Sequence, residues 1–162
     1  MAESITVEQS APKAIKYEQL IPQIKALVGE ETHLVACLSN ITAAIHETFG
    51  FLWTGFYTVE GNELVLGPFQ GPVACMRITI GRGVSGAVLA QNQTLVVPDV
   101  DQFPGHIACS SLSRSEIVVP VRDKNGEIRA VFDADSAHLS TFDHEDKKYL
   151  EEICDWIGKQ VF

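Results

Sequence analysis

Apolar residues recur at helical spacing in three parts of the chain. In the first they fall at Tyr17, Leu20, Ile21, Ile24, Leu27 and Val28. In the others they fall at Leu34, Leu38, Ile41, Ile45 and Phe49, and at Leu150, Ile153, Ile157 and Val161. This spacing predicts two helices near the start and one at the end. Pro22 indicates a bend or a later start in the first helix, and Gly50 ends the second. Residues 140–143, Ser-Thr-Phe-Asp, offer N-cap candidates for the third.

Between residues 51 and 134 the pattern changes to short apolar and β-branched runs separated by turn residues, which is typical of strands. The runs cover residues 51–59, 63–66, 73–80, 94–97, 116–121 and 127–134, with a short helix over 84–91. Turns at 60–62 and 123–126 join neighbouring runs as hairpins. The order predicts an α+β fold with a mainly antiparallel central sheet flanked by N- and C-terminal helices. We expect one domain, residues 14–162, after a flexible N-terminal tail, residues 1–13.

The chain is acidic, with 162 residues, a net charge of −9 and a sequence pI near 4.9. An acidic surface repels phosphate, so neither nucleic acid nor an anionic membrane is an expected partner. The sequence has no leader pattern at its N-terminus and no apolar run near the roughly 18 residues that span a bilayer. We therefore expect a cytoplasmic protein, in which the four cysteines do not form structural disulfides.

The cysteines fall into two pairs. Cys37 and Cys154 lie on apolar helix faces, where free cysteine is a small core residue. Cys75 and Cys109 lie in segments rich in glycine, proline and serine, and His106 precedes Cys109 by three residues. A protonated histidine and backbone N–H groups would lower the pKa of a thiol and make it a nucleophile. By themselves these residues favour a partly buried loop cysteine, and a zinc site of Cys75, His106 and Cys109 would lack a fourth ligand.

Three carboxylates form a second constellation. Asp133 and Asp135 are two apart on a predicted strand and share a face. A short turn joins that strand to the one beginning at Glu116, so Glu116 and Asp135 lie near the same end of the hairpin. Crowded carboxylates raise one another's pKa, and such a cluster can hold a ligand ammonium and donate a proton. The alternative is a solvated acidic strand end.

Trp53 and Tyr57 are four apart on the first predicted strand and share a face. Aromatic residues on one strand face are usually core residues. They are also suited to line an apolar ligand or to bind an ammonium by a cation–π contact.

Residues 81–86, Gly-Arg-Gly-Val-Ser-Gly, match the G-x-G-x-x-G pattern of dinucleotide-binding proteins. That fingerprint requires a full crossover helix in a βαβ unit of about 30 residues. Here residues 91–94 interrupt the pattern after one short helix. We therefore interpret the glycines as a tight turn from a strand to a helix.

Several segments, in order from Trp53 to Ser136, together resemble the free methionine-R-sulfoxide reductases, a family built on the GAF fold. They are Trp-Thr-Gly-Phe-Tyr at 53–57, Gly-Pro-Phe-Gln-Gly-Pro-Val-Ala-Cys at 67–75, Gly-Arg-Gly-Val at 81–84, Gly-His-Ile-Ala-Cys at 105–109, Ser-Arg-Ser-Glu-Ile-Val-Val-Pro at 113–120 and Asp-Ala-Asp-Ser at 133–136. The resemblance implies a single GAF-type domain and the reduction of free methionine-R-sulfoxide to methionine.

The resemblance also implies how the chemistry runs. Cys109 matches the attacking cysteine and Cys75 a resolving cysteine, so that a Cys109 sulfenic acid gives a Cys75–Cys109 disulfide. A thioredoxin-like dithiol would then reduce that disulfide. No metal or organic cofactor is implied, and the family is expected to form a homodimer, in which the apolar faces of the terminal helices would find a partner.

The resemblance assigns the pocket as well. Glu116, Asp133 and Asp135 match the acidic pocket that holds the substrate, and one of them would donate the proton that the sulfoxide oxygen needs. Trp53 and Tyr57 match the aromatic wall of that pocket.

One position departs from the family pattern. Where the family usually has G-V-C-G, this chain has Val84-Ser85-Gly86. Either this member works with two cysteines, or Ser85 replaces a cysteine. The departure concerns the regeneration of the thiol and not the chemical step.

The competing interpretation is a sensory GAF module that binds a small ligand without chemistry. The domain fills nearly all of the sequence, which leaves no room for an output domain. We also find no N-K-x-F-D-E motif of the cyclic-nucleotide-binding GAF domains. We therefore favour the enzyme.

Overall fold

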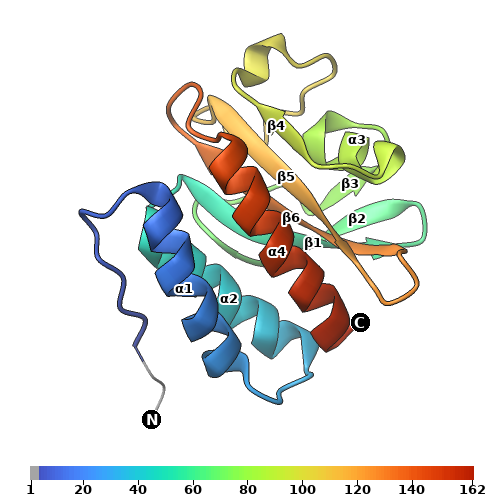
Figure 1. Ribbon diagram of the computed structural model, residues 1–162. Helices are drawn as coiled ribbons and strands as arrows, with labels where there is room; N and C mark the ends of the chain where they lie inside the picture. Colours follow the sequence, from blue (N-terminus) through green and yellow to red (C-terminus); the bar gives the residue numbers. More distant parts are fainter. Residues whose placement is uncertain (1–3) are drawn as a thin grey trace.

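The computed structural model describes residues 4–162 as four helices and one antiparallel sheet (Figure 1). The sheet has the strand order β3-β2-β1-β6-β5-β4. Its strands are β1 (Trp53–Glu60), β2 (Glu63–Gln70), β3 (Arg77–Thr79), β4 (Leu95–Val97), β5 (Ser115–Arg122) and β6 (Ile128–Ser136). The helices are α1 (Lys13–Val28), α2 (Leu34–Phe49), α3 (Gly83–Gln91) and α4 (His144–Val161), with a 3₁₀ turn, η1, at Val100–Gln102. The predicted α+β class is confirmed.

The two faces of the sheet carry separate apolar cores. On one face α2 and α4 pack over the sheet and bury alternate residues of β1, β5 and β6, including Phe56, Ile117 and Phe132, while α1 packs against α2 and α4 (Figure 1). On the other face α3 and the loops around it cover a smaller core that contains Trp53 and Tyr57. Alternation of side chains along a strand therefore separates a helix-covered face from a loop-covered face. The loop-covered face has room for a ligand.

Two sequence-based predictions are wrong in detail. The strand expected over residues 73–80 is reduced to β3, and residues 71–76 form a loop. Val73 and Met76, which suggested a strand, are 86% and 78% exposed and pack in neither core. The first helix has no late start, because α1 runs from Lys13 through Pro22. Pro22 faces solvent, so the carbonyl group freed by its missing N–H can bind water.

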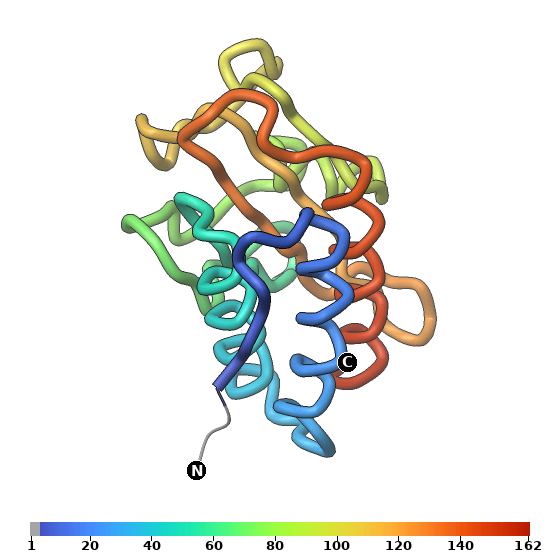
Figure 2. Tube along the Cα trace, turned by 60° about the vertical axis from the view of Figure 1, so that its left-hand side comes forward, coloured from blue at the N-terminus to red at the C-terminus, as the bar shows by residue number. Residues whose placement is uncertain are grey.

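The segment before α1 lies along that helix. The backbone N–H of Thr6 donates to Gln23 Oε1 at 2.8 Å, and that of Glu8 donates to Gln19 Oε1 at 2.9 Å. Figure 2 shows this segment running in the direction opposite to α1. Ile5 and Val7 also contact the larger core. Among residues 4–162, no helix has both the length and the apolar character that a crossing of the lipid bilayer requires.

A buried carboxylate joins the first and last helices. Asp146 in the first turn of α4 is fully buried. It accepts hydrogen bonds from the Tyr17 hydroxyl at 2.7 Å and from Lys13 Nζ at 2.5 Å. It also accepts one from the backbone N–H of Asp143 at 2.9 Å, which completes a capping box. The charge of Asp146 is therefore compensated only while α1 is in place.

We expect Asp146→Asn to lower the free energy of unfolding by up to about 3 kcal/mol, because the change leaves Lys13 without its buried partner. Partial exposure of Lys13 limits the loss. Urea unfolding at pH 7 measures it. The control is Lys25→Ala, which removes an exposed pair with Glu152 and costs less than about 1 kcal/mol. Equal stability of the two variants would contradict the role given to Asp146.

Candidate functional site

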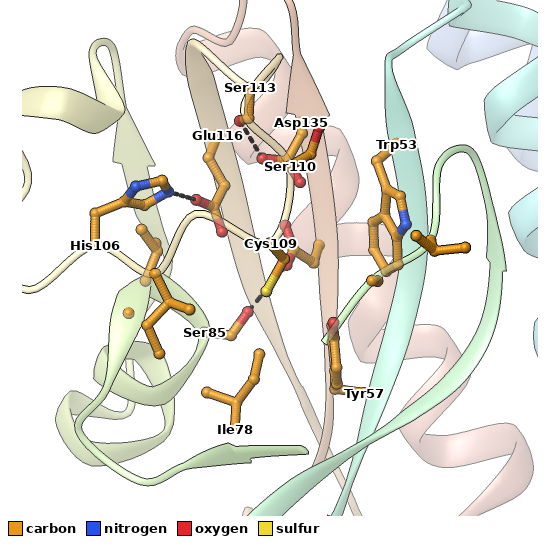
Figure 3. A pocket seen from close by; sticks show the side chains of 16 residues that line it. Trp53, Tyr57, Ile78, Ser85, His106, Cys109, Ser110, Ser113, Glu116 and Asp135 are labelled. Carbon is orange, nitrogen blue, oxygen red and sulfur yellow. Dashed lines mark hydrogen bonds and ion pairs between the residues drawn. The ribbon is translucent and has the colours of Figure 1, made fainter. Parts of the chain in front are cut away.

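A cavity of about 570 Å³, its mouth included, opens on the loop-covered face of the sheet. Side chains from β1, β3, β5, β6, α3 and two loops line it (Figure 3). Six of the seven residues that the sequence proposes for the site line this cavity: Trp53, Tyr57, Cys109, Glu116, Asp133 and Asp135. The seventh, Cys75, is bonded to Cys109 at its edge.

Strand register brings the carboxylates together. Glu116 on β5 pairs directly with Asp135 on β6, and Asp135 pairs with Trp53 on β1. Asp133 lies two residues before Asp135 on the same face. The carboxylate oxygens of the three residues lie within 4.8 Å of one another. The expected convergence of Glu116 and Asp135 at one end of the hairpin therefore agrees with the observed pairing.

Burial and crowding make these carboxylates weak acids. Burial raises the pKa of Glu116 well above its usual value, and the charge of Asp135 raises it further. The pKa of Asp133 is raised well above its usual value by burial and then by Glu116. The pKa of Asp135 is raised to about 6, chiefly by burial. The cluster is therefore able to keep a proton near neutral pH and to bind a positively charged group.

The aromatic side of the cavity is a stack that glycine makes possible. The Trp53 ring lies 5.9 Å from that of Tyr57 and 5.3 Å from that of Phe69, centroid to centroid. A Cβ at Gly55 would come within 2.6 Å of the Trp53 ring. Only glycine at this position lets the indole lie across the strand, so Gly55 shapes the wall.

The two loop cysteines form a disulfide at the edge of the cavity. Cys75 and Cys109 have a Cα–Cα distance of 5.5 Å and are joined through their sulfur atoms. The Tyr57 hydroxyl donates to the Cys75 carbonyl oxygen at 3.0 Å and holds the Cys75 loop against the aromatic wall. A zinc site of Cys75, His106 and Cys109 is incompatible with this bond, because each thiolate is used. Cys37 and Cys154 are free and buried, as expected of core residues.

Each carboxylate of the cluster contacts a polar side chain that the sequence did not predict as its partner. His106 Nε2 lies 3.6 Å from Glu116 Oε2, so the histidine faces a carboxylate (Figure 3). Ser85 Oγ donates to Asp133 Oδ2 at 3.1 Å. Ser113 Oγ donates to Asp135 Oδ1. Each carboxylate is thus oriented by one side chain from α3 or from the Cys109 loop.

Two buried polar atoms at the site have no hydrogen-bond partner among residues 4–162. They are Trp53 Nε1 and Asp133 Oδ1. An unpaired buried donor or acceptor costs about 1–3 kcal/mol, so both atoms favour a ligand that pairs with them. One is a donor and the other an acceptor, which suits a ligand that carries both kinds of group.

The carboxylates also form an oxygen-rich set of the kind that Mg²⁺ or Ca²⁺ prefers. Their raised pKa values, however, favour protonated forms, which are poor metal ligands. A cluster that keeps a proton in this way can donate it, and its remaining negative charge can pair with a ligand ammonium. The dinucleotide interpretation of residues 81–86 also fails, because β3 and β4 lie at opposite edges of the sheet and form no βαβ unit.

Known proteins are similar to this chain in fold and in sequence over almost its whole length. The sequence model of the GAF domain matches residues 33–161. The free methionine-R-sulfoxide reductase of Escherichia coli is 44% identical over 144 residues, which are 88% of this chain and 87% of that protein. A free methionine-R-sulfoxide reductase of Neisseria meningitidis, solved in complex with its substrate, has a TM-score of 0.92 and 50% identity, covering 97% of this chain and 95% of that one.

These matches place the chain in a class and then in a family. It is a GAF-domain protein. Within that class it belongs to the free methionine-R-sulfoxide reductase family.

Proposed function

We propose that this chain reduces free methionine-R-sulfoxide to methionine, with Cys109 as the attacking thiol. The observation that carries the proposal is that Cys109 and three carboxylates of raised pKa line one cavity. A thiol supplies the nucleophile, and a carboxyl group that keeps its proton supplies the acid. Neither part of this chemistry requires a metal or an organic cofactor.

The reaction starts from the reduced protein. The Cys109 thiolate attacks the sulfoxide sulfur, and one of the three carboxyl groups protonates the oxygen, which otherwise leaves poorly. Methionine departs with its sulfur reduced, and the oxygen remains on Cys109 as a sulfenic acid. The Cys75 thiol attacks that sulfur, water leaves, and the Cys75–Cys109 disulfide forms. A thioredoxin-like dithiol then returns two electrons and two protons.

The cavity also accounts for binding of a free amino acid. The substrate ammonium lies among Glu116, Asp133 and Asp135, where it satisfies Asp133 Oδ1. The thioether end packs on the rings of Trp53 and Tyr57. The ammonium compensates the negative charge of the buried carboxylates, which lowers the free-energy cost of burying them together.

Family membership supports three further parts of the proposal: a homodimer, a thioredoxin-like reductant and a cytoplasmic location. The dimer contact needs a surface other than the one suggested by the sequence. The apolar face of α1 packs on α2 and α4, and that of α4 packs on α1 and β5, within a single chain. A non-catalytic ligand-binding module is the competing function, and the disulfide at the edge of the cavity favours the enzyme over it.

The enzyme should discriminate strongly against N-acetylated methionine sulfoxide. Acetylation removes the positive charge and leaves buried carboxylates without a partner, and a hydrogen bond to a charged group contributes about 1.5–3 kcal/mol. We therefore expect kcat/KM to fall about 10–100-fold, measured as methionine or acetylmethionine formed. Dithiothreitol is the reductant in both assays, and the amount of oxidised dithiothreitol shows that its supply is not limiting. Equal rates on the two substrates would exclude the proposed use of the carboxylates.

A further inference from the structure

The disulfide lies next to the most exposed apolar side chains in the described part of the molecule. Val73, Met76 and Leu112 are 86%, 78% and 59% exposed, more than any other large hydrophobic residue among 4–162. Val73 and Met76 flank Cys75, and Leu112 lies three residues after Cys109. We call these three residues the apolar rim.

Val73 also lines the cavity, but neither folding nor substrate binding explains the exposure of the other two rim residues. Met76 and Leu112 belong to neither apolar core, and neither lines the cavity. The segments that carry the rim, residues 67–76 and 107–113, contain no charged side chain, although the chain has a net charge of −9. Exposed apolar residues gathered in an uncharged segment are typical of a surface that a partner covers.

We propose that the apolar rim is the docking surface for a protein dithiol of the thioredoxin class. The proposal rests on the proposed function, because that function leaves the protein with a disulfide to be reduced. An incoming thiolate must approach the disulfide to bonding distance, so a protein reductant has to cover the residues beside it. The centres of protein–protein interfaces are depleted of charge, as the rim is. A small dithiol has no need of such a surface.

The position of the two sulfur atoms indicates which one is attacked. Cys109 lines the substrate cavity, whereas Cys75 does not. A partner thiolate that bonds to Cys75 Sγ breaks the Cys75–Cys109 bond and releases Cys109 as the thiolate needed for the next turnover. The second partner thiol then attacks the partner's own sulfur and frees Cys75. The partner ends as a disulfide, and two electrons and two protons have passed to this chain.

The test is the rate at which reduced thioredoxin reduces the preformed Cys75–Cys109 disulfide, followed by the appearance of thiols after mixing, with no sulfoxide present. The variant is Met76→Ser combined with Leu112→Ser, and the matched control is Val35→Ser, which removes a 55% exposed apolar residue from α2. Truncation at an interface hot spot costs more than about 1 kcal/mol. We expect the second-order rate constant of the double variant to fall about tenfold, while dithiothreitol reduces all three proteins at equal rates.

Three outcomes would overturn the proposal. The first is an unchanged rate constant with thioredoxin. The second is an equal loss with thioredoxin and dithiothreitol, which would mean that the loops themselves are altered. The third is a change from dimer to monomer in sedimentation, which would assign the rim to a contact between copies of this chain. Because no sulfoxide is used, failure of the proposed reductase activity is detected separately, as absence of methionine formation.

Discussion

Cys109→Ser is expected to abolish methionine formation even in a single turnover, whereas Cys75→Ser releases about one methionine per chain and then stops. The difference follows from the order of the steps. Attack and oxygen transfer need Cys109 and no other cysteine, whereas resolution of the sulfenic acid needs a second thiol. In Cys75→Ser no disulfide forms at the edge of the cavity, so thioredoxin would have to condense with the Cys109 sulfenic acid inside the cavity, and we expect the cycle to stop there.

The measurement is methionine released per chain with thioredoxin, thioredoxin reductase and NADPH present. Titration of thiols provides a second readout: the unsubstituted protein loses two thiols per chain when the sulfoxide is added, and a non-catalytic module loses none. Adding Ser85→Cys to Cys75→Ser should relieve the stall, since Ser85 and Cys109 line the same cavity. Sustained turnover of Cys75→Ser alone would show that another thiol reaches Cys109 directly.

Glu116→Gln and Asp135→Asn should each lower kcat/KM by about 10²–10⁴-fold, the usual loss for a positioned acid. Both amides keep the shape of the side chain and remove its negative charge and its acidic proton. The loss should therefore appear in substrate binding, in proton transfer or in both. Activity near that of the unsubstituted protein in both variants would contradict the proposed role of the cluster.

Stability separates loss of function from loss of fold in these variants. The pKa of Asp135 is about 6 in the folded chain and about 3.9 in an unfolded one. The folded state therefore binds more protons between about pH 4 and pH 6, and stability falls as the pH rises through this window. Asp135→Asn removes that loss, so urea unfolding should find the variant more stable at pH 7 but not below pH 4. A less stable variant at pH 7 would show that Asp135 contributes to folding.

The sequence predicts the acidic half of the site well, because local rules determine it. Alternation places Asp133 and Asp135 on one face, and the short turn between β5 and β6 fixes Glu116 opposite Asp135. The loops are different. Val73 and Met76 resembled strand residues because they are apolar, yet both are exposed beside the disulfide. The sequence alone does not distinguish an apolar residue exposed at the surface from one buried in the core.

The polar partners of the carboxylates also escaped prediction. His106, Ser85 and Ser113 come from a loop, from α3 and from the turn before β5, and only the folded chain brings them to Glu116, Asp133 and Asp135. The periodicity of apolar residues along the sequence does not predict contacts between such distant residues. Pro22 is a related case, because the apolar face of α1 is buried strongly enough to keep the helix continuous through a proline.

The pairing of Glu116 with Asp135 also bears on how faithfully the chain folds. A hairpin of β5 and β6 formed one residue out of register would turn a whole strand over. Aspartates 133 and 135 would then enter the core beneath α1, α2 and α4, where an unpaired charge costs several kcal/mol. We therefore expect these carboxylates to disfavour the misaligned hairpin during folding. Neutral substitutions such as Asp135→Asn weaken this effect, and misassembly during synthesis becomes a second consequence of a mutation chosen for its effect on catalysis.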